Sequence, residues 1–435
     1  MKILLINALN INQEKTSFFN SIVRNLFVNP SLSTQQIAAI TPKNHSVRVI
    51  DDAYNNIKFT EKNYDLIAIS CIHTSSALRA YEIADKFRQQ KKTVVLGGWH
   101  PSILPNEAKQ HANSIVIGEA EHIWPQLLKD HKKGELKPFY YQKKPVYFKD
   151  IPHPDREILN KNSLTAGVQA SRGCPFGCEF CTLTNQQFGC IFRTRTIENV
   201  IEEIRVIPQK IILFYDSSFT LNPDYTKTLF KELKVLKKKF RCWMNADLPL
   251  KDEEFLKLAS EAGCIAIDIG FESLSNKTIN ILGKKTIDTK TSKKVIRKIH
   301  DHGISVGGTF MFGFDNDTKK TMDETLQNIS SIDIDVPRFA ILTPFPGTPL
   351  YHKLDADGRI FTKDWSKYDL NHVVFHPKNM SPEELQSEWQ RIYNEVYSST
   401  NLLKRTCKKN NLNFSSWIWR LTFNIFEKGV NSGFY

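Results

Sequence analysis

The chain is poor in cysteine and has no hydrophobic run long enough for a membrane span. Its 435 residues include eight cysteines and five methionines. No stretch reaches the roughly 18 uninterrupted apolar residues that a spanning helix needs. The opening residues, MKILLINALN, lack the basic start and long apolar core of a signal peptide. These absences argue against a disulfide scaffold and predict a cytoplasmic protein in a reducing compartment.

The composition is that of a globular protein with an excess of positive charge. Hydrophobic residues make up 41% and charged residues 24% of the chain, and 59 basic minus 46 acidic residues gives a net charge of +13. The length predicts two or three domains. The charge is compatible with an anionic substrate, nucleic acid or an acidic membrane surface and selects none of them. Because the basic residues are dispersed and no RNA-binding module is present, we expect no nucleic-acid partner.

The first part of the chain alternates short apolar runs with helical patterns. The run at 75–90 has the spacing of an amphipathic helix. This alternation predicts an α/β, Rossmann-like, doubly wound domain over residues 1–130. The runs typical of buried parallel strands are 2–8, 46–52, 65–71, 93–98 and 114–120.

A second α/β alternation follows a lysine- and proline-rich segment, 131–164, which is typical of a linker. Six strand-and-helix units over residues 165–350 predict a partial barrel of the (β/α)6 type, with functional groups at the carboxyl ends of its strands. The expected strands are 165–171, 211–216, 241–246, 265–270, 304–312 and 338–343.

Residues 351–435 are predicted to be a mainly helical C-terminal segment on the substrate side. Ser381 and Pro382 begin a helix expected over 381–407. The aromatic stretch 414–426 predicts another helix. We expect its apolar face to dock in the core, with contact to a partner or a membrane interface as alternatives. That face comprises Phe414, Trp417, Ile418, Leu421 and Ile425.

Three of the eight cysteines lie close together in the segment SRGCPFGCEFC, residues 171–181. Thiolates are soft ligands that suit zinc or an iron–sulfur cluster. A structural zinc site takes four ligands, usually as two separated pairs, and no second pair follows nearby. Three thiolates on a cubane cluster would leave one iron open to a small molecule. A zinc knuckle and buried structural thiols remain as alternatives.

This segment resembles the signature of the radical S-adenosylmethionine (SAM) superfamily, CxxxCxxC with an aromatic residue before the third cysteine. Cys174, Cys178 and Cys181 match, as does Phe180. The resemblance implies a [4Fe-4S] cluster on the three cysteines, with SAM bound to the open iron and cleaved to a 5′-deoxyadenosyl radical. The SAM contacts that it implies are Phe180, Asp216, Ser217, Glu272, Ser273 and Arg195, with Arg193 as an alternative to Arg195.

The N-terminal domain resembles the cobalamin-binding domain of cobalamin-dependent radical SAM enzymes. The segments 96–108, 117–128 and 151–156 carry this resemblance. The loop after the first strand has no histidine, so the resemblance implies cobalt without a protein imidazole, and we expect His73 to be a polar loop residue. A Rossmann-like domain that binds no corrin is the alternative. The implied cobalamin contacts are Ser70, Thr74, Ser75, Gly97, Gly98, Gly118 and Glu119.

Further segments, 310–326, 341–354 and 358–385, look like the branch that includes hopanoid methylases. This resemblance implies methyl transfer to an unactivated carbon through the deoxyadenosyl radical and methylcobalamin. A cyclase or rearrangement enzyme with the same cofactors and a non-catalytic cobalamin or iron–sulfur sensor are the alternatives. Expected partners are a small-molecule, lipid-like or peptide substrate and an external electron donor such as flavodoxin or ferredoxin. Residues 414–426 are the expected place of any peripheral membrane contact. Asp364, Trp365 and Tyr368 are candidates for the substrate side, with packing as the alternative.

Overall fold

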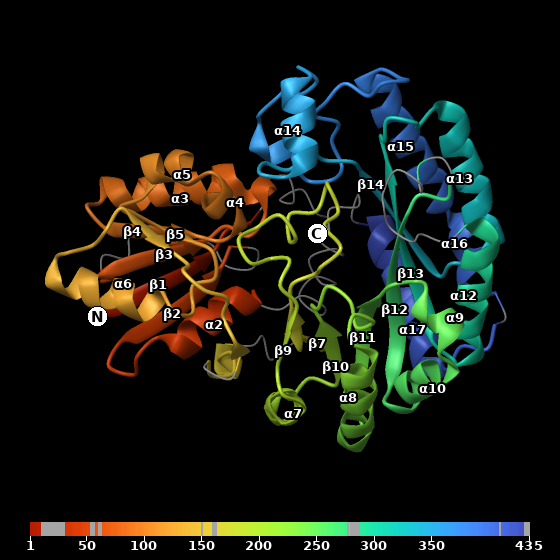
Figure 1. Ribbon diagram of the computed structural model, residues 1–435, viewed down its shortest axis with the longest axis horizontal. Coiled ribbons are helices and arrows are strands. Elements are labelled where there is room, and N and C mark those ends of the chain that lie inside the picture. Colours follow the sequence, from red (N-terminus) through yellow and green to blue (C-terminus); the bar gives the residue numbers. More distant parts are fainter. Residues whose placement is uncertain are drawn as a thin grey trace.

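Two parallel sheets face each other, and a C-terminal segment bridges them (Figure 1). The computed structural model describes residues 1–9, 31–52, 57–59, 63–148, 151–158, 163–275, 278, 288–408 and 410–429. The predicted strands are all present, with ends displaced by at most three residues. The loop after the first strand, where the sequence lacks a histidine, lies largely outside the described residues.

The first sheet has six parallel strands in the order β2-β1-β3-β4-β5-β6. Its sixth strand is β6, Phe139–Tyr141, which pairs with β5 and comes from the segment expected to be a linker. A three-residue strand is too short to show an apolar pattern, so β6 was not predicted from the sequence. The other strands are β1 (Lys2–Asn7), β2 (Ser46–Asp51), β3 (Leu66–Ser70), β4 (Thr93–Gly97) and β5 (Ser114–Ile117).

Helices cover both faces of this sheet, so its central strands are apolar on both sides. Leu4 and Ile6 of β1 face α3 (Ala77–Gln89) and α5 (Pro105–His111), whereas Ile3 and Leu5 face α2 (Leu32–Ile40) and α6 (Trp124–Lys133). The short helix α4 (Trp99–Ile103) follows β4 directly.

The second sheet also has six parallel strands, but they follow one another in chain order and curl into a partial barrel. The strands are β7 (Thr165–Val168), β10 (Ile211–Phe214), β11 (Lys239–Met244), β12 (Cys264–Glu272), β13 (Ser305–Phe312) and β14 (Val336–Ile341). Its outer helices are α7 (Ile197–Val206), α8 (Pro223–Leu236), α9 (Leu248–Lys251), α10 (Glu253–Glu261), α12 (Thr289–Asp301) and α13 (Lys319–Ser331). The predicted fold class is confirmed.

The segment after the barrel fastens the two sheets together. Helix α14 (Pro349–Ala356) lies above the gap between them in Figure 1. In the short helix η5 (Trp365–Lys367), Trp365 is 6% exposed, and its indole nitrogen donates to Glu107 of α5 at 2.9 Å. Tyr368 is 1% exposed in the same core. Trp365 and Tyr368 therefore pack against the first domain, and Asp364 caps η5 by accepting from the Ser366 amide.

The helix expected over 381–407 is two helices, α15 (Pro382–Val396) and α16 (Ser399–Thr406). Ser398 caps α16 by accepting from the amide of Asn401, which starts a new helix in a new direction. Helix α17 (Phe414–Gly429) then packs against β12, β13 and β14.

The expected apolar face of α17 is not the face that packs. Phe414 is 76% exposed and Ile418 is 40% exposed, whereas Trp419 and Phe423 are buried against the inner side of the barrel. Arg420 and Glu427 are buried with them, because the barrel supplies partners for their charges. Within the described residues, no helix combines the length and apolar character needed to cross a bilayer.

Candidate active site

The three cysteines lie in a loop between two short antiparallel strands, β8 (Ser171–Arg172) and β9 (Arg193–Thr194). This loop lies between the two sheets in Figure 1. Cys178 is buried, and Cys174 and Cys181 are partly exposed. Gly177 has a φ of 63°, and a Cβ there would meet nothing within 4 Å, so open space adjoins the loop. Asn185 donates to the carbonyls of Cys178 (3.2 Å) and Cys181 (2.7 Å) and holds the turn in shape.

These thiols fit a cluster better than a single ion. In the described part of the chain, no three histidine, cysteine or acidic side chains converge on one point as ligands of a single ion do. A zinc site would require such convergence, whereas a cubane takes each thiolate on a different iron. None of the three is in a disulfide. The donor set therefore fits the [4Fe-4S] cluster expected from the sequence.

Asp216 and Ser217, at the end of β10, hold the start of this loop. Ser217 Oγ donates to the carbonyl of Gly173 at 2.7 Å. The Asp216 carboxylate accepts from the amide of Ala170 (3.1 Å) and from Ser171 Oγ (2.5 Å). Burial raises the pKa of Asp216 to about 6, although these hydrogen bonds oppose the shift. The expected SAM contacts of both residues stay predictions, and the contacts seen here tie β10 to the loop.

Other predicted SAM contacts lie at the barrel's upper edge. Phe180 is partly buried and meets Phe314 edge-on, with ring centroids 6.5 Å apart. Glu272 ends β12 with a left-handed φ of 60°, next to an irregularity in the pairing with β13. Ser273 is buried, and its hydroxyl accepts from the amide of Ser275 at 3.1 Å. A positive φ at a non-glycine residue is costly and often marks a functional position.

Arg195 is committed elsewhere in the protein. Its guanidinium pairs with Glu203 of α7 and donates to the carbonyl of Gln169 at 3.0 Å. Glu203 also pairs with Arg156, so a buried carboxylate lies between two arginines. Arg195 was expected to bind the SAM carboxylate, but its guanidinium is already used in a buried ion pair. The sequence around Arg195 could not show this, because the pair forms only when the chain folds.

The predicted cobalamin residues line the carboxyl edge of the first sheet. Ser70 Oγ lies 3.2 Å from Ser33 Oγ, and Thr74 and Ser75 form a buried 3-10 turn. Gly97 ends β4, and Gly98 has a φ of 113°. A Cβ on Gly98 would come within 2.3 Å of the Cys71 carbonyl oxygen. Gly98 is therefore required by the close approach of β3 and β4, so its role in admitting a corrin stays a prediction.

Glu119 joins the first domain to the cysteine loop. Its carboxylate accepts from Arg193 Nη1 (2.8 Å) and Nη2 (3.0 Å) and lies 3.3 Å from Arg172 Nη1. Burial disfavours its charge, but Arg193 and Arg172 outweigh this, and the pKa lies below its usual value. Gly118, with a φ of 92°, leaves no room for a Cβ beside Gln142. We expected Glu119 to contact cobalamin. In the structure its carboxylate instead pairs with Arg172 of β8 and Arg193 of β9, the two strands that flank the cysteine loop.

Two exposed residues near the carboxyl edges of the two sheets were not predicted as site residues. Tyr215 is 50% exposed, yet burial raises its pKa. His73 is also exposed, yet burial lowers its pKa to about 4. Both residues follow the carboxyl ends of strands, β10 and β3, which is the signal that could have found them.

These features define a class of protein: a partial barrel with a three-cysteine loop, joined to a doubly wound domain whose carboxyl edge faces it. Residues 168–329 match the Radical SAM superfamily, residues 27–128 match the B12 binding domain, and residues 348–417 match a domain of unknown function. Two enzymes of Chlorobaculum tepidum are similar over most of their length. Bacteriochlorophyllide d C-12(1)-methyltransferase is 32% identical, covering 94% of this chain and 91% of the enzyme. Bacteriochlorophyllide d C-8(2)-methyltransferase is 30% identical, covering 85% and 86%.

The chain belongs to the cobalamin-dependent radical SAM enzymes, the family of these two relatives. Its fold agrees with two solved structures. The radical SAM methyltransferase TsrM from Kitasatospora setae, with cobalamin and a [4Fe-4S] cluster bound, gives a TM-score of 0.69 at 15% identity, covering 98% of this chain and 99% of TsrM. The cobalamin-dependent radical enzyme OxsB gives 0.70 at 17% identity, covering 98% and 71%. The predicted family, enzyme class and cofactors are confirmed.

Proposed function

We propose that this enzyme transfers a methyl group to an unactivated carbon of a small-molecule substrate. The observation that carries the proposal is the clamp at Glu119, which holds the cysteine loop against the B12-binding domain through Arg172 and Arg193. A radical and a methyl donor must act on one carbon atom in succession, so the two cofactor sites have to be kept close and fixed. The two C. tepidum relatives named above are methyltransferases.

The bound cofactors would supply the radical and the methyl group, and the chain supplies position and exclusion of water. Cys174, Cys178 and Cys181 would hold the cluster. Ser217 fixes the loop backbone by donating to the Gly173 carbonyl. Tyr215 and His73, both exposed, would face the bound cofactors from the carboxyl ends of β10 and β3.

We also propose the remaining contacts expected from the sequence. For SAM they are Phe180, Asp216, Ser217, Glu272 and Ser273, and for cobalamin Ser70, Thr74, Ser75, Gly97 and Gly98. The support is their position at the two facing carboxyl edges, where ligands of parallel sheets bind.

The net reaction replaces one C–H bond of the substrate by a C–CH3 bond. One SAM becomes methionine and 5′-deoxyadenosine, which takes the hydrogen atom. A second SAM gives the methyl group and becomes S-adenosylhomocysteine. Two electrons enter per turnover, and we propose an external donor such as flavodoxin or ferredoxin for them. The net charge of +13 suits an acidic donor.

Isotope transfer tests this function directly. The anaerobically reconstituted enzyme is given SAM with a trideuterated methyl group, a reductant and candidate substrates. Methylation predicts a product that gains the intact CD3 group, with S-adenosylhomocysteine and deoxyadenosine formed in equal amounts. A product that loses hydrogen and gains no label would instead favour cyclisation, the reaction named for two magnesium-protoporphyrin IX monomethyl ester cyclases that are 25% and 24% identical to this chain.

Peripheral membrane contact through residues 414–426 is a further part of the proposal. It is supported by Phe414, Ile418 and Ile425, which are between 37% and 76% exposed on the outer face of α17. Sedimentation with anionic vesicles should be reduced by Phe414→Ser with Ile418→Ser. Equal sedimentation of this variant and the unchanged protein would exclude the contact.

A further inference from the structure

The inner face of the barrel is built differently from its outer face. Along β11, Phe240, Cys242 and Met244 belong to the core under the outer helices, so the alternating residues Arg241 and Trp243 point inward. The same alternation places small residues on the inner face of the neighbouring strands, so larger side chains from adjacent strands can lie over them. These small residues are Gly167, Gly270, Gly307 and Ala340.

A layer of charged side chains crosses the barrel and forms a floor. Asp268 of β12 pairs with Arg241 through Nε and with Arg338 of β14, whose Nη1 lies 2.7 Å from the carboxylate. Arg338 Nε also contacts Glu427 of α17 at 2.8 Å. A Cβ on Gly307 would come within 2.2 Å of Asp268 Oδ1, so the layer lies directly against β13.

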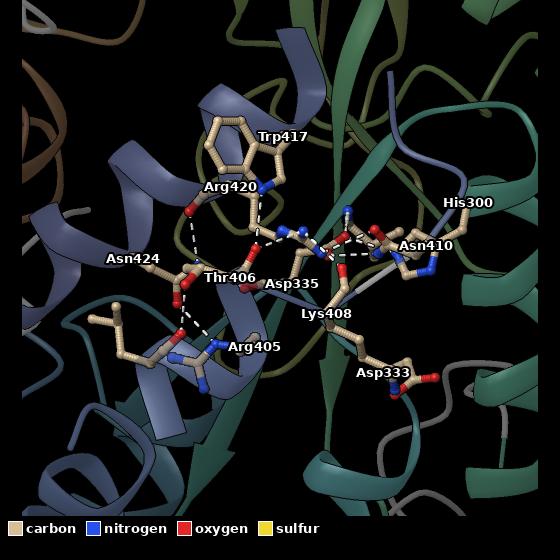
Figure 2. A network of polar contacts seen from close by, with 12 residues as sticks. His300, Asp333, Asp335, Arg405, Thr406, Lys408, Asn410, Trp417, Arg420 and Asn424 are labelled. Carbon is tan, nitrogen blue, oxygen red and sulfur yellow. Dashed lines mark hydrogen bonds and ion pairs between the residues drawn. The ribbon is translucent and has the colours of Figure 1, made fainter. Parts of the chain in front are cut away.

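Helix α17 supports this floor from below and is locked in place. Its Arg420 is 1% exposed and donates to Asp335 at 3.2 Å and to the Thr406 carbonyl at 2.8 Å (Figure 2). Asp335 also accepts from His300 (2.7 Å) and from the amide of Val306 (2.7 Å). Because breaking such a buried network is costly, the floor is a permanent part of the barrel.

Arg241 of this floor keeps two nitrogens for another partner. Its guanidinium carbon lies 5.9 Å from the Trp243 ring, 5.6 Å from Trp419 and 5.3 Å from Phe423. Only Nε is used by Asp268, and among the described residues neither Nη nitrogen donates a hydrogen bond. The side chain is 16% exposed. A rigid guanidinium with two unused donors matches the geometry of a carboxylate.

Tyr215 lies one layer above Arg241. Leu213 pairs with Arg241, so Tyr215 and Trp243, each two residues further on, line the space over the floor. The Tyr215 ring covers Gly167, where a Cβ would come within 2.2 Å of it. Positive charges on Arg241 and Arg156 oppose the rise in the Tyr215 pKa that burial causes. The surroundings of this hydroxyl are therefore electropositive.

We propose that Arg241 and Tyr215 form a subsite that binds a carboxylate of the substrate at the floor of the barrel. This inference rests on the proposed function and names the substrate class: a small molecule with an apolar body and a carboxylate group. Trp243 would flank the apolar body. The carboxylate anchors the molecule at the base, so the carbon to be modified lies above it, toward the cysteine loop.

The test compares acids with their methyl esters on the fully reconstituted enzyme. Two probe pairs are used: a chlorin monocarboxylic acid and its methyl ester by fluorescence, and 4-fluorobenzoate and its methyl ester by ¹⁹F NMR. We expect at least one acid to bind more tightly than its ester. Arg241→Met should weaken binding of that acid about 10- to 100-fold, the range for a hydrogen bond to a charged group, and leave the ester unchanged.

Matched variants separate the subsite from a general effect. Lys239→Met removes the same charge from the exposed start of the same strand and should change nothing. Arg241→Lys should bind the acid more tightly than Arg241→Met but less tightly than the wild type, because lysine lacks the paired donors of a guanidinium. Tyr215→Phe should weaken binding of the acid a few-fold. Thermal melting checks that each variant is folded. Equal binding of acid and ester in both pairs, or an unchanged acid affinity in Arg241→Met, overturns the subsite.

SAM also has a carboxylate, so it is titrated alone as a third probe. Arg241→Met should leave its affinity unchanged, because the subsite lies at the base of the barrel. Loss of SAM affinity with no loss for the acids would assign Arg241 to SAM and overturn the substrate subsite. Transfer of the CD3 group from trideuterated SAM is measured in a separate experiment. The methylation hypothesis can therefore be confirmed when the subsite hypothesis is rejected, and the reverse.

Discussion

The two sheets of this enzyme are both parallel and both six-stranded, but they use their faces differently. In the first sheet, consecutive residues Ile3, Leu4 and Leu5 are all buried against helices. In the second, β11 alternates buried Phe240 and Cys242 with inward Arg241 and Trp243. Only the second sheet has an inner face that holds charges, aromatic rings and glycines.

This difference reflects what each sheet has to enclose. An open sheet covered on both sides can bind a ligand only at its carboxyl edge. A curled sheet can also bind one inside, provided that its inner residues do not fill the space. Helix α17 and the Asp268 layer close the base of that space, so the second sheet presents both an edge and an interior. The substrate-binding role therefore falls to the barrel.

The largest effect is expected in the cysteine loop between the sheets. Cys178→Ala should abolish the visible absorbance of the cluster and all product formation, because one of three iron ligands is lost. Corrinoid binding by the first domain should persist, as measured by its spectrum after gel filtration. Cys190→Ala, an exposed cysteine of the same loop, is the control and should retain iron. Loss of corrinoid in Cys178→Ala would contradict the separation of the two sites.

The next effect concerns the base of the barrel. Asp335→Ala leaves buried Arg420 without its carboxylate and should lower the free energy of unfolding by about 3–5 kcal/mol. Asp333→Asn, two residues away, removes an exposed pair with Lys408, keeps a residue type that tolerates the left-handed φ of 64° at this position, and should cost under about 1 kcal/mol. Urea unfolding measures both. Equal costs would mean that α17 is not held by this network.

A smaller effect is expected at the clamp between the domains. Glu119→Gln removes the charge shared by Arg193 and Arg172 and should cost about 1–3 kcal/mol. Because the pKa of Glu119 is lowered, its stabilisation is present above the usual glutamate range and is lost as the pH falls through the lowered value. The difference in the free energy of unfolding between variant and wild type should therefore be larger at pH 7 than at pH 3. Glu135→Gln, at an exposed position, should differ at neither pH.

The smallest effect is a pH dependence inside the barrel. The pKa of Asp216 is raised to about 6 in the folded protein. The protonated carboxyl therefore stabilises the folded state fully at pH values below the pKa of Asp216 in the unfolded chain, and this stabilisation is lost as the pH rises through about 6. Between pH 5 and pH 7 the wild type should lose about 1 kcal/mol of stability through this group. Asp216→Asn should not show this loss. Parallel stability curves of the two proteins over that range would refute the assignment.

Much of the fold could be predicted because strand and helix patterns are local. The apolar runs of both sheets and the three cysteines lie within short windows of sequence. The strand β6 and the break at Ser398 were missed because each depends on a few residues whose pattern is weak. The buried face of α17 was predicted wrongly. The prediction assumed that the apolar face of a helix is buried and the polar face is exposed, whereas the buried face of α17 includes the charged residues Arg420 and Glu427.

The sequence by itself determined the cofactor class, since the spacing of Cys174, Cys178 and Cys181 allows three thiolates on one cluster within eight residues of chain. Only the tertiary structure decided which charges are buried and paired. Arg193 and Glu119 are 74 residues apart, and Arg420 and Asp335 are 85 apart. The cost of burying a charge is offset only when folding brings its partner into contact, and no local pattern records where that partner will come from.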